Sequence, residues 1–129
     1  MDKYESVKGE NMDKIIEIDG KEVKFRATAR TPRLYRGIIG RDMIADMNKL
    51  QKRFKDISEG DDQSLAIDEL QIFEDTAYIM ARQADPDMKE KTADDWLDTF
   101  GMFSIYEVLP QILELWALNT KQTSTPKKK

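Results

Sequence analysis

The sequence predicts a mainly α-helical domain of about five helices with a small β-hairpin near its N-terminus, an α+β arrangement. Apolar residues recur at helical spacings of three and four along most of the chain, and one Asp-Gly pair stands between two short alternating segments. At 129 residues, the chain has room for one domain with one modest core. We expect that domain to span residues 13–120, between a disordered polar segment 1–12 and a disordered basic tail 121–129.

The predicted hairpin occupies residues 14–26. Ile16 and Ile18 alternate with a charged residue before the turn, and Val23 and Phe25 do so after it. An Asp-Gly pair between alternating segments is a strong short-range signal of a two-residue hairpin turn. Because a lone hairpin is only marginally stable in water, we expect it to pack on the helices, with its edges open to strand addition.

The segment from Thr31 to Ile57 predicts a short helix, a glycine corner and a long amphipathic helix. The short helix begins at Thr31, whose hydroxyl can cap it, and at Pro32, which suits the first helical position. Gly40 suits the left-handed conformation that ends this helix, and Asp42 suits the N-terminus of the next. The long helix is expected to bury one seam of side chains, formed by Met43, Met47, Leu50, Phe54 and Ile57.

The second half of the sequence predicts three more helices. One runs from about Ser64 to Ala84 and ends at an Asp-Pro-Asp sequence, because a residue before proline avoids the helical region. A short one follows, capped by Thr92. The expected core of the whole domain includes twelve side chains: Phe25, Leu34, Ile38, Met43, Met47, Leu50, Leu70, Phe73, Ala77, Leu109, Ile112 and Trp116.

The last predicted helix is apolar on nearly all sides. It opens with a capping-box pattern of Ser104 and Glu107, and Pro110 is expected to kink it. A helix without a polar face is buried by its own domain or by another chain. Residues 105–118 are therefore either core or interface.

Charge is distributed unevenly, although the formal net charge is only −4. Residues 21–55 hold eleven Lys/Arg against three acidic residues, whereas residues 56–120 hold sixteen Asp/Glu against three basic ones. The two halves can neutralise each other within one fold, which is the simpler interpretation, or between neighbouring copies. We also expect the chain to form homo-oligomers, through these charges and the apolar surplus of residues 105–118.

Composition removes much catalytic chemistry. The sequence contains neither cysteine nor histidine, so it lacks a thiolate nucleophile, the usual general base and the commonest metal ligand. Its acidic loops do not match an EF-hand, which requires glycine at the sixth position, and no P-loop is present. We therefore expect no enzyme activity, no catalytic residue, no metal and no cofactor.

The sequence also indicates a cytoplasmic protein. No apolar run approaches the roughly 18 residues that span a bilayer, and the polar N-terminal segment lacks the apolar stretch of a signal peptide. We expect no membrane contact.

The basic region 24–55 allows an alternative function in nucleic-acid binding. Arg33 and Arg36 lie three residues apart, so they share a helix face and could contact phosphates. The sequence lacks a recognition-helix arrangement and an aromatic platform for bases. Nucleic acid is therefore the alternative partner, not the first.

The stretch ATARTPRLYRGIIGRDMIADMNKL resembles the tail assembly chaperones of long-tailed phages and prophages of Gram-positive bacteria. It follows a short hairpin, and the likeness extends more loosely over residues 13–120. Ile39 stands where the family often has a bulky aromatic residue. These short motifs carry the resemblance, and none of them is catalytic: Thr31-Pro32, Tyr35-Arg36, Gly40-Arg41-Asp42 and Lys49-Leu50.

The resemblance implies a non-enzymatic assembly factor in the host cytoplasm, absent from the mature virion. It would bind the tape measure protein and keep it soluble until tail tube subunits assemble around it. A structural tail component is a further alternative. We expect partner contacts from residues of these motifs and from the apolar helix faces. The expected partner-binding residues are Tyr35, Arg36, Arg41, Met43, Met47, Ile105, Leu109, Ile112 and Trp116.

Genes of this family commonly encode a second, longer product reached by ribosomal frameshifting. The chain ends in Pro126 and three lysines, and consecutive lysines can be encoded by an adenine run on which ribosomes slip. A solubilising basic tail explains the same residues equally well. With a longer product, residues 121–129 would form a linker to a second domain that binds the tail tube protein.

Overall fold

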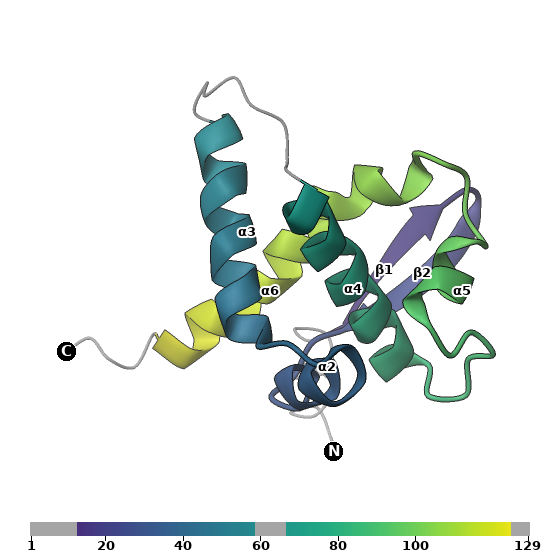
Figure 1. The fold of residues 1–129 in the computed structure, drawn as a ribbon, viewed down its shortest axis with the longest axis horizontal. Helices are drawn as coiled ribbons and strands as arrows, with labels where there is room; N and C mark the ends of the chain where they lie inside the picture. The colour runs from purple at the N-terminus through teal and green to yellow at the C-terminus, as the bar shows by residue number, and fades with distance from the viewer. Residues whose placement is uncertain (1–12, 59–66, 125–129) are drawn as a thin grey trace, which may run out of the picture.

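The computed structural model describes residues 13–58 and 67–124, which form a two-stranded hairpin and five α-helices around one core (Figure 1). Helix α4 is central and packs against β2, α2, α3 and α5. The predicted mainly α-helical fold with a small N-terminal hairpin is confirmed. In chain order the elements are β1 (Asp13–Ile18), β2 (Lys21–Arg26), α2 (Thr31–Ile39), α3 (Met43–Ser58), α4 (Ile67–Ala84), α5 (Ala93–Leu97), the 3₁₀ helix η1 (Ser104–Val108) and α6 (Leu109–Ser124).

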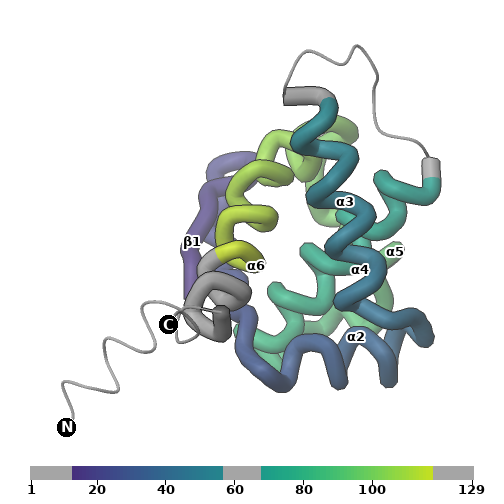
Figure 2. The backbone as a smooth tube through the Cα atoms, turned by 90° about the vertical axis from the view of Figure 1, so that its left-hand side faces the viewer, coloured from purple at the N-terminus to yellow at the C-terminus, as the bar shows by residue number. Residues whose placement is uncertain are grey.

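The hairpin forms as predicted. Asp19 and Gly20 have φ angles of +55° and +77°, which is the left-handed pair that a type I′ turn requires. The strands are antiparallel, with Ile16 opposite Val23. Because successive side chains point to opposite faces, one face buries Ile16 and Phe25. Helix α6 lies beside β1 (Figure 2), and the Lys14 ammonium contacts the Glu114 carboxylate at 3.3 Å.

The glycine corner between α2 and α3 is confirmed. Gly40 has φ +88°, and its N–H donates to the carbonyls of Tyr35 and Arg36 at 3.2 and 3.0 Å. The Asp42 carboxylate accepts from the Ile44 N–H at 3.0 Å, so it caps the start of α3.

The predicted cap at Thr31 is wrong. Arg30 occupies the N-cap position without a side-chain hydrogen bond, and Thr31 is the first residue of α2. Its buried hydroxyl accepts from the Thr28 N–H at 2.8 Å and donates to Gln83 Oε1 at 2.5 Å. Gln83 Nε2 in turn donates to the Thr28 hydroxyl at 2.6 Å. The Thr31 hydroxyl therefore takes part in a hydrogen-bond network with Gln83 of α4 and does not cap α2.

The core prediction holds for most of its side chains. Leu34, Leu70 and Trp116 are only partly buried. The prediction is wrong for Ile38, whose side chain is 40% exposed. Ile38 shares a helix face with Thr31, but periodicity does not tell how far along a helix the neighbouring elements reach. The side chains that the prediction places correctly in the core are Phe25, Met43, Met47, Leu50, Phe73, Ala77, Leu109 and Ile112.

The C-terminal region differs from its prediction. Ser104 is no cap, since η1 has no side-chain cap and the Ser104 hydroxyl donates to the Asp19 carboxylate. Pro110 does not kink a helix. It is the second residue of α6, where its missing N–H costs nothing. Helix α6 also continues to Ser124, past residue 121, where the tail was expected to begin.

The apolar surplus of η1 and α6 is covered by the chain's own domain. Side chains at the exposed positions include Glu107, Pro110 and Glu114. The helix therefore has a polar face that the count of apolar residues concealed. The buried side chains are Ile105, Val108, Leu109, Ile112, Leu113 and Leu115.

Opposite charges pair within the fold, as the simpler interpretation predicts. Arg53 Nε contacts Glu69 Oε1 at 3.1 Å, and Lys49 contacts Asp68, so two ion pairs join α3 to α4. The expectations for segment 1–12, for a helix start near Ser64, for the Ile57 side chain and for residues 125–129 lie outside what the structure describes.

Candidate partner-binding surface

Most of the predicted partner-binding residues are core residues in this conformation. A partner would reach them only if the fold opened. Arg36 is exposed, whereas Arg41 and Trp116 are partly covered. The six buried ones are Tyr35, Met43, Met47, Ile105, Leu109 and Ile112.

Arg41 forms a polar cluster that joins three helices. Its Nε donates to Asp46 Oδ2 at 2.9 Å, and its Nη2 donates to Tyr35 Oη at 2.8 Å and to Asp75 Oδ2 at 2.9 Å. The Tyr35 hydroxyl donates to Asp46 Oδ2 at 2.8 Å. Burial raises the pKa of Asp75, and the Arg41 guanidinium opposes that rise. Because Arg41 contacts carboxylates of both α3 and α4, the cluster fixes the corner between α2 and α3 against α4.

A tight turn after α5 exposes two large apolar side chains. The Ser104 N–H donates to the Gly101 carbonyl at 3.2 Å, which places Met102 and Phe103 at the tip of a β-turn. Met102 is 79% exposed and Phe103 is 73% exposed. We call these two residues the apolar tip.

The hairpin holds the apolar tip from both sides. Asp19 Oδ2 accepts from the Gly101 N–H at 2.6 Å, and Asp19 Oδ1 accepts from the Ser104 hydroxyl. These hydrogen bonds, from Ser104 first and Gly101 second, lower the pKa of Asp19. The tip is thus presented by a fixed turn.

Tyr106 lies three residues after Phe103, and two contacts with α4 hold it in place. Its hydroxyl donates to Glu74 Oε2 at 2.6 Å, and its ring lies 5.9 Å from that of Phe73. The hydrogen bond to Glu74, with burial, raises the pKa of Tyr106 to about 12. Helix α4 therefore anchors η1 just after the tip.

Sequence reasoning missed the apolar tip because a turn has no periodicity. A signal was nonetheless available: two large apolar residues stand between Gly101 and Ser104, in a segment too short to be a helix. The contact with Asp19 could not be read from the sequence, because it depends on how the hairpin packs.

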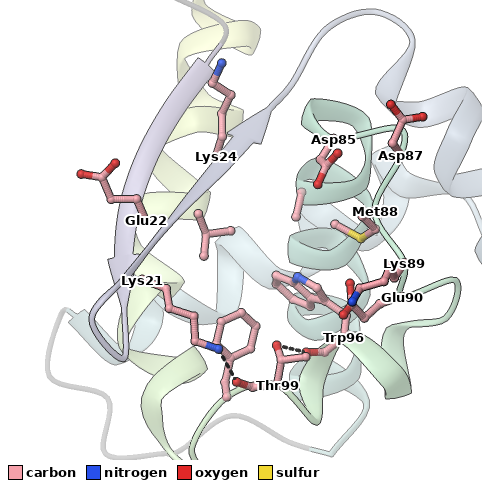
Figure 3. Close-up of a pocket in the computed structure, with 13 residues that line it drawn as sticks. Lys21, Glu22, Lys24, Asp85, Asp87, Met88, Lys89, Glu90, Trp96 and Thr99 are labelled. Carbon is pink, nitrogen blue, oxygen red and sulfur yellow. Dashed lines mark hydrogen bonds between the residues drawn. The ribbon is translucent and has the colours of Figure 1, made fainter.

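An open groove lies between β2 and the segment after α4 (Figure 3). It has a volume of about 570 Å³, with Trp96 and Phe100 among the residues that line it. Lys21 Nζ donates to the Thr99 carbonyl at 2.9 Å and lies 5.4 Å from the centre of the Phe100 ring, which links β2 to the end of α5.

A basic face begins at Arg30, the N-cap residue of α2, and continues along that helix. Arg30, Arg33 and Arg36 recur every three residues and are exposed. Within residues 13–58 and 67–124, none of them has a carboxylate partner, in contrast to Arg26, which Asp13 pairs at 2.7 Å. Both predicted phosphate-contacting residues, Arg33 and Arg36, belong to this face.

Residues 13–58 and 67–124 contain no group of three or more acidic side chains that could hold a metal ion. None of the helices within them is long and apolar enough to cross a membrane. Comparison of the chain with protein-family models, with curated proteins and with solved structures finds no match.

Proposed function

We propose that this chain is a non-enzymatic phage tail assembly chaperone, which binds the tape measure protein and keeps it soluble during tail morphogenesis. The observation that carries the proposal is the apolar tip, whose two large side chains are held in water by the contacts of Asp19. The resemblance of residues 27–50 to the chaperone family supplies the partner. In this proposal the chain works in the host cytoplasm and is absent from the mature virion.

The chemistry of the apolar tip suits a hydrophobic partner. Met102 is flexible and polarisable, and Phe103 is large and rigid, so together they can fit into the apolar face of an amphipathic helix. Covering each side chain contributes about 1.5–3 kcal/mol. Two such anchors alone correspond to a dissociation constant between about millimolar and tens of micromolar.

Weak binding by one copy favours a chaperone that acts as several copies. A long tape measure protein offers many apolar segments, and linked copies raise the effective concentration of each contact. We therefore include a second copy of this chain among the partners. A longer, frameshifted product would add the tail tube protein, and the codons for Lys127 to Lys129 test that part directly.

Co-expression tests the proposal. The tape measure gene product is expressed alone and with this chain, and its soluble fraction is measured. The proposal predicts a rise in that fraction and co-purification of the two proteins. An unchanged fraction without co-purification contradicts the proposal. Detection of the chain in purified virions would instead favour a structural tail component.

The basic face of α2 favours nucleic-acid binding as the second candidate function. Three arginines that contact phosphates would give an affinity that falls with salt at a log–log slope of about −3. A gel shift with duplex DNA at two salt concentrations measures that slope. Arg33→Glu should abolish the shift if this function holds, and the absence of any shift in the wild-type chain rejects it.

A further inference from the structure

The outer edge of β2 has backbone groups without partners. Ile18 and Lys21 flank the two-residue turn, so the Lys21 N–H donates to the Ile18 carbonyl. The backbone N–H and C=O groups of Lys21 and Val23 therefore point toward β1. Pairing alternates along an antiparallel strand, and the N–H and C=O groups of Glu22 and Lys24 therefore point away from β1. No backbone or side-chain hydrogen bond to these groups occurs within the described ranges.

This edge forms one wall of the groove. Figure 3 shows Lys21 reaching across the lower end, whereas Glu22 and Lys24 direct their side chains away from the hollow. Val23 is on the inner face of the hairpin and contributes to the lining, together with Trp96 and Met88. An unpaired strand edge thus stands beside an apolar surface.

The opposite wall is held in place. The Tyr78 hydroxyl donates to the Glu90 carbonyl at 2.9 Å, and Arg82 Nη1 donates to the Tyr78 hydroxyl at 2.9 Å and to the Lys91 carbonyl at 3.0 Å. Lys91 Nζ donates to the Met88 carbonyl at 2.7 Å. A preformed groove avoids the entropic cost of ordering the wall on binding.

The opposite wall is also acidic. Asp85, Asp87 and Glu90 line the groove, and Lys89 is the cation beside them. Within the part of the chain that the structure describes, none of the three carboxylates has a side-chain hydrogen bond or an ion pair. Lys21 and Lys24 line the β2 side, so only the wall opposite β2 favours the positively charged side chains of a ligand.

We propose that this groove binds an extended peptide segment of another protein, which adds as a third strand to the free edge of β2. Its backbone pairs with the outward groups of Glu22 and Lys24. An apolar side chain between the two paired positions lies beside Val23 over Trp96. Basic side chains next to it face Asp85 and Asp87. This site is separate from the apolar tip and does not depend on the proposed function.

Amide exchange tests the strand addition directly. The probe is a synthetic heptapeptide of alternating valine and threonine with a lysine at each end, added to the full chain. Exchange of the Glu22 and Lys24 amides should slow, whereas that of Val23, already bonded to Ile16, should not change. A bound probe that leaves both outward amides unprotected overturns the proposal, and so does the absence of binding at millimolar peptide.

A matched pair of variants separates backbone pairing from side-chain contact. Lys24→Pro removes the outward N–H at a position where an edge strand tolerates proline, and Lys24→Ala keeps it. We expect the first to bind the probe at least ~10-fold more weakly than the second. Equal affinities contradict the proposal. Should Lys24→Pro fail to fold, the amide-exchange pattern of the wild-type chain decides whether the peptide pairs with β2.

The same exchange measurement identifies the occupant. If exchange of the Glu22 and Lys24 amides slows with protein concentration alone, the occupant is a second copy, and the assignment to another protein is wrong.

Discussion

The carboxylate of Asp19 accepts a hydrogen bond from the backbone N–H of Gly101 at 2.6 Å, and through it the hairpin turn holds a loop 82 residues further along the chain. The same residue adopts the left-handed conformation that the turn requires. A Cβ added at Gly101 would lie 3.2 Å from the Ser104 hydroxyl oxygen and 3.5 Å from Asp19 Oδ2. One turn residue therefore both reverses the chain and holds the loop on which Met102 and Phe103 are exposed.

Asp19→Asn should loosen the apolar tip without breaking the hairpin. Asparagine tolerates the left-handed conformation, but it lacks the charge that strengthens the two accepted hydrogen bonds. We expect faster amide exchange at Gly101, with exchange at Val23 unchanged. Asp98→Asn, at the exposed residue that caps the C-terminus of α5, is the control. Identical exchange at Gly101 in all three proteins would show that Asp19 does not hold the tip.

The pH dependence of this contact has a defined sign. Because the folded pKa of Asp19 is lowered, its contribution to stability is present above the unfolded value of about 3.9 and is lost as the pH falls through the folded value. Gly101 protection in the wild type should therefore persist at pH 4 and be lost only at lower pH, as Asp19 becomes protonated in the fold. In Asp19→Asn it should not titrate there.

Arg41→Ala should destabilise the fold more at neutral than at acidic pH. It leaves the buried Asp75 without its cation, which costs about 1–3 kcal/mol. The pKa of Asp75 is already raised by burial, so it will rise further. A folded pKa above the unfolded one means that stability falls as pH rises between the two values. Urea unfolding at pH 4.5 and pH 7 measures the difference.

Rescue tests the same account. Asp75→Asn removes the buried charge, so the double variant with Arg41→Ala should regain part of the lost stability at pH 7. A loss for Arg41→Ala that is equal at both pH values, without rescue by Asp75→Asn, would mean that electrostatics at Asp75 is not the cause.

Leu50→Ala should lower the free energy of unfolding by about 2–5 kcal/mol, since Leu50 is fully buried in the α3 seam and truncation leaves a cavity. Lys52→Ala, on the exposed side of the same helix, should change it by no more than about 0.5 kcal/mol. Chemical denaturation of both variants measures this. Similar values for the two would reject the α3 packing.

Self-association should depend on salt. At tens of micromolar we expect light scattering to show species larger than a monomer, and about 1 M salt, which screens charges beyond about 3 Å, should shift them toward monomers. Arg33→Glu reverses one charge of the exposed α2 face and should do the same at low salt. A chain that stays monomeric at every concentration and salt would remove this part of the proposal.

Local signals explain what could be predicted from the sequence. The Asp19-Gly20 turn, the Gly40 corner and the Met43 to Leu50 seam are each specified by neighbouring residues, through left-handed conformations or helical periodicity. These features need no knowledge of distant segments. They were therefore predicted with the right residue types and nearly the right boundaries.

Tertiary contacts explain what could not be predicted. Thr31 and Ser104 each match a capping pattern, but neither hydroxyl caps a helix. The Thr31 hydroxyl donates to the buried Gln83, and the Ser104 hydroxyl donates to the Asp19 carboxylate. The buried position of Asp75 likewise depends on a distant residue, because Arg41 donates a hydrogen bond to its carboxylate. The candidate site depends on the same kind of contact, because the Asp19 contact decides where the apolar tip stands.

The central claim is that the apolar tip binds the tape measure protein, and one comparison tests it most directly. The double variant Met102→Ser/Phe103→Ser is co-expressed with the tape measure protein, beside Ile38→Ser/Ile44→Ser, which removes two other exposed apolar side chains. Circular dichroism first checks that both variants are folded. We expect the soluble fraction of the tape measure protein to fall at least ~10-fold for the tip variant, because two anchors of about 1.5–3 kcal/mol each are lost. For the control variant we expect the soluble fraction to stay at the wild-type level. A tip variant that keeps the tape measure protein soluble as well as the wild type would contradict the account.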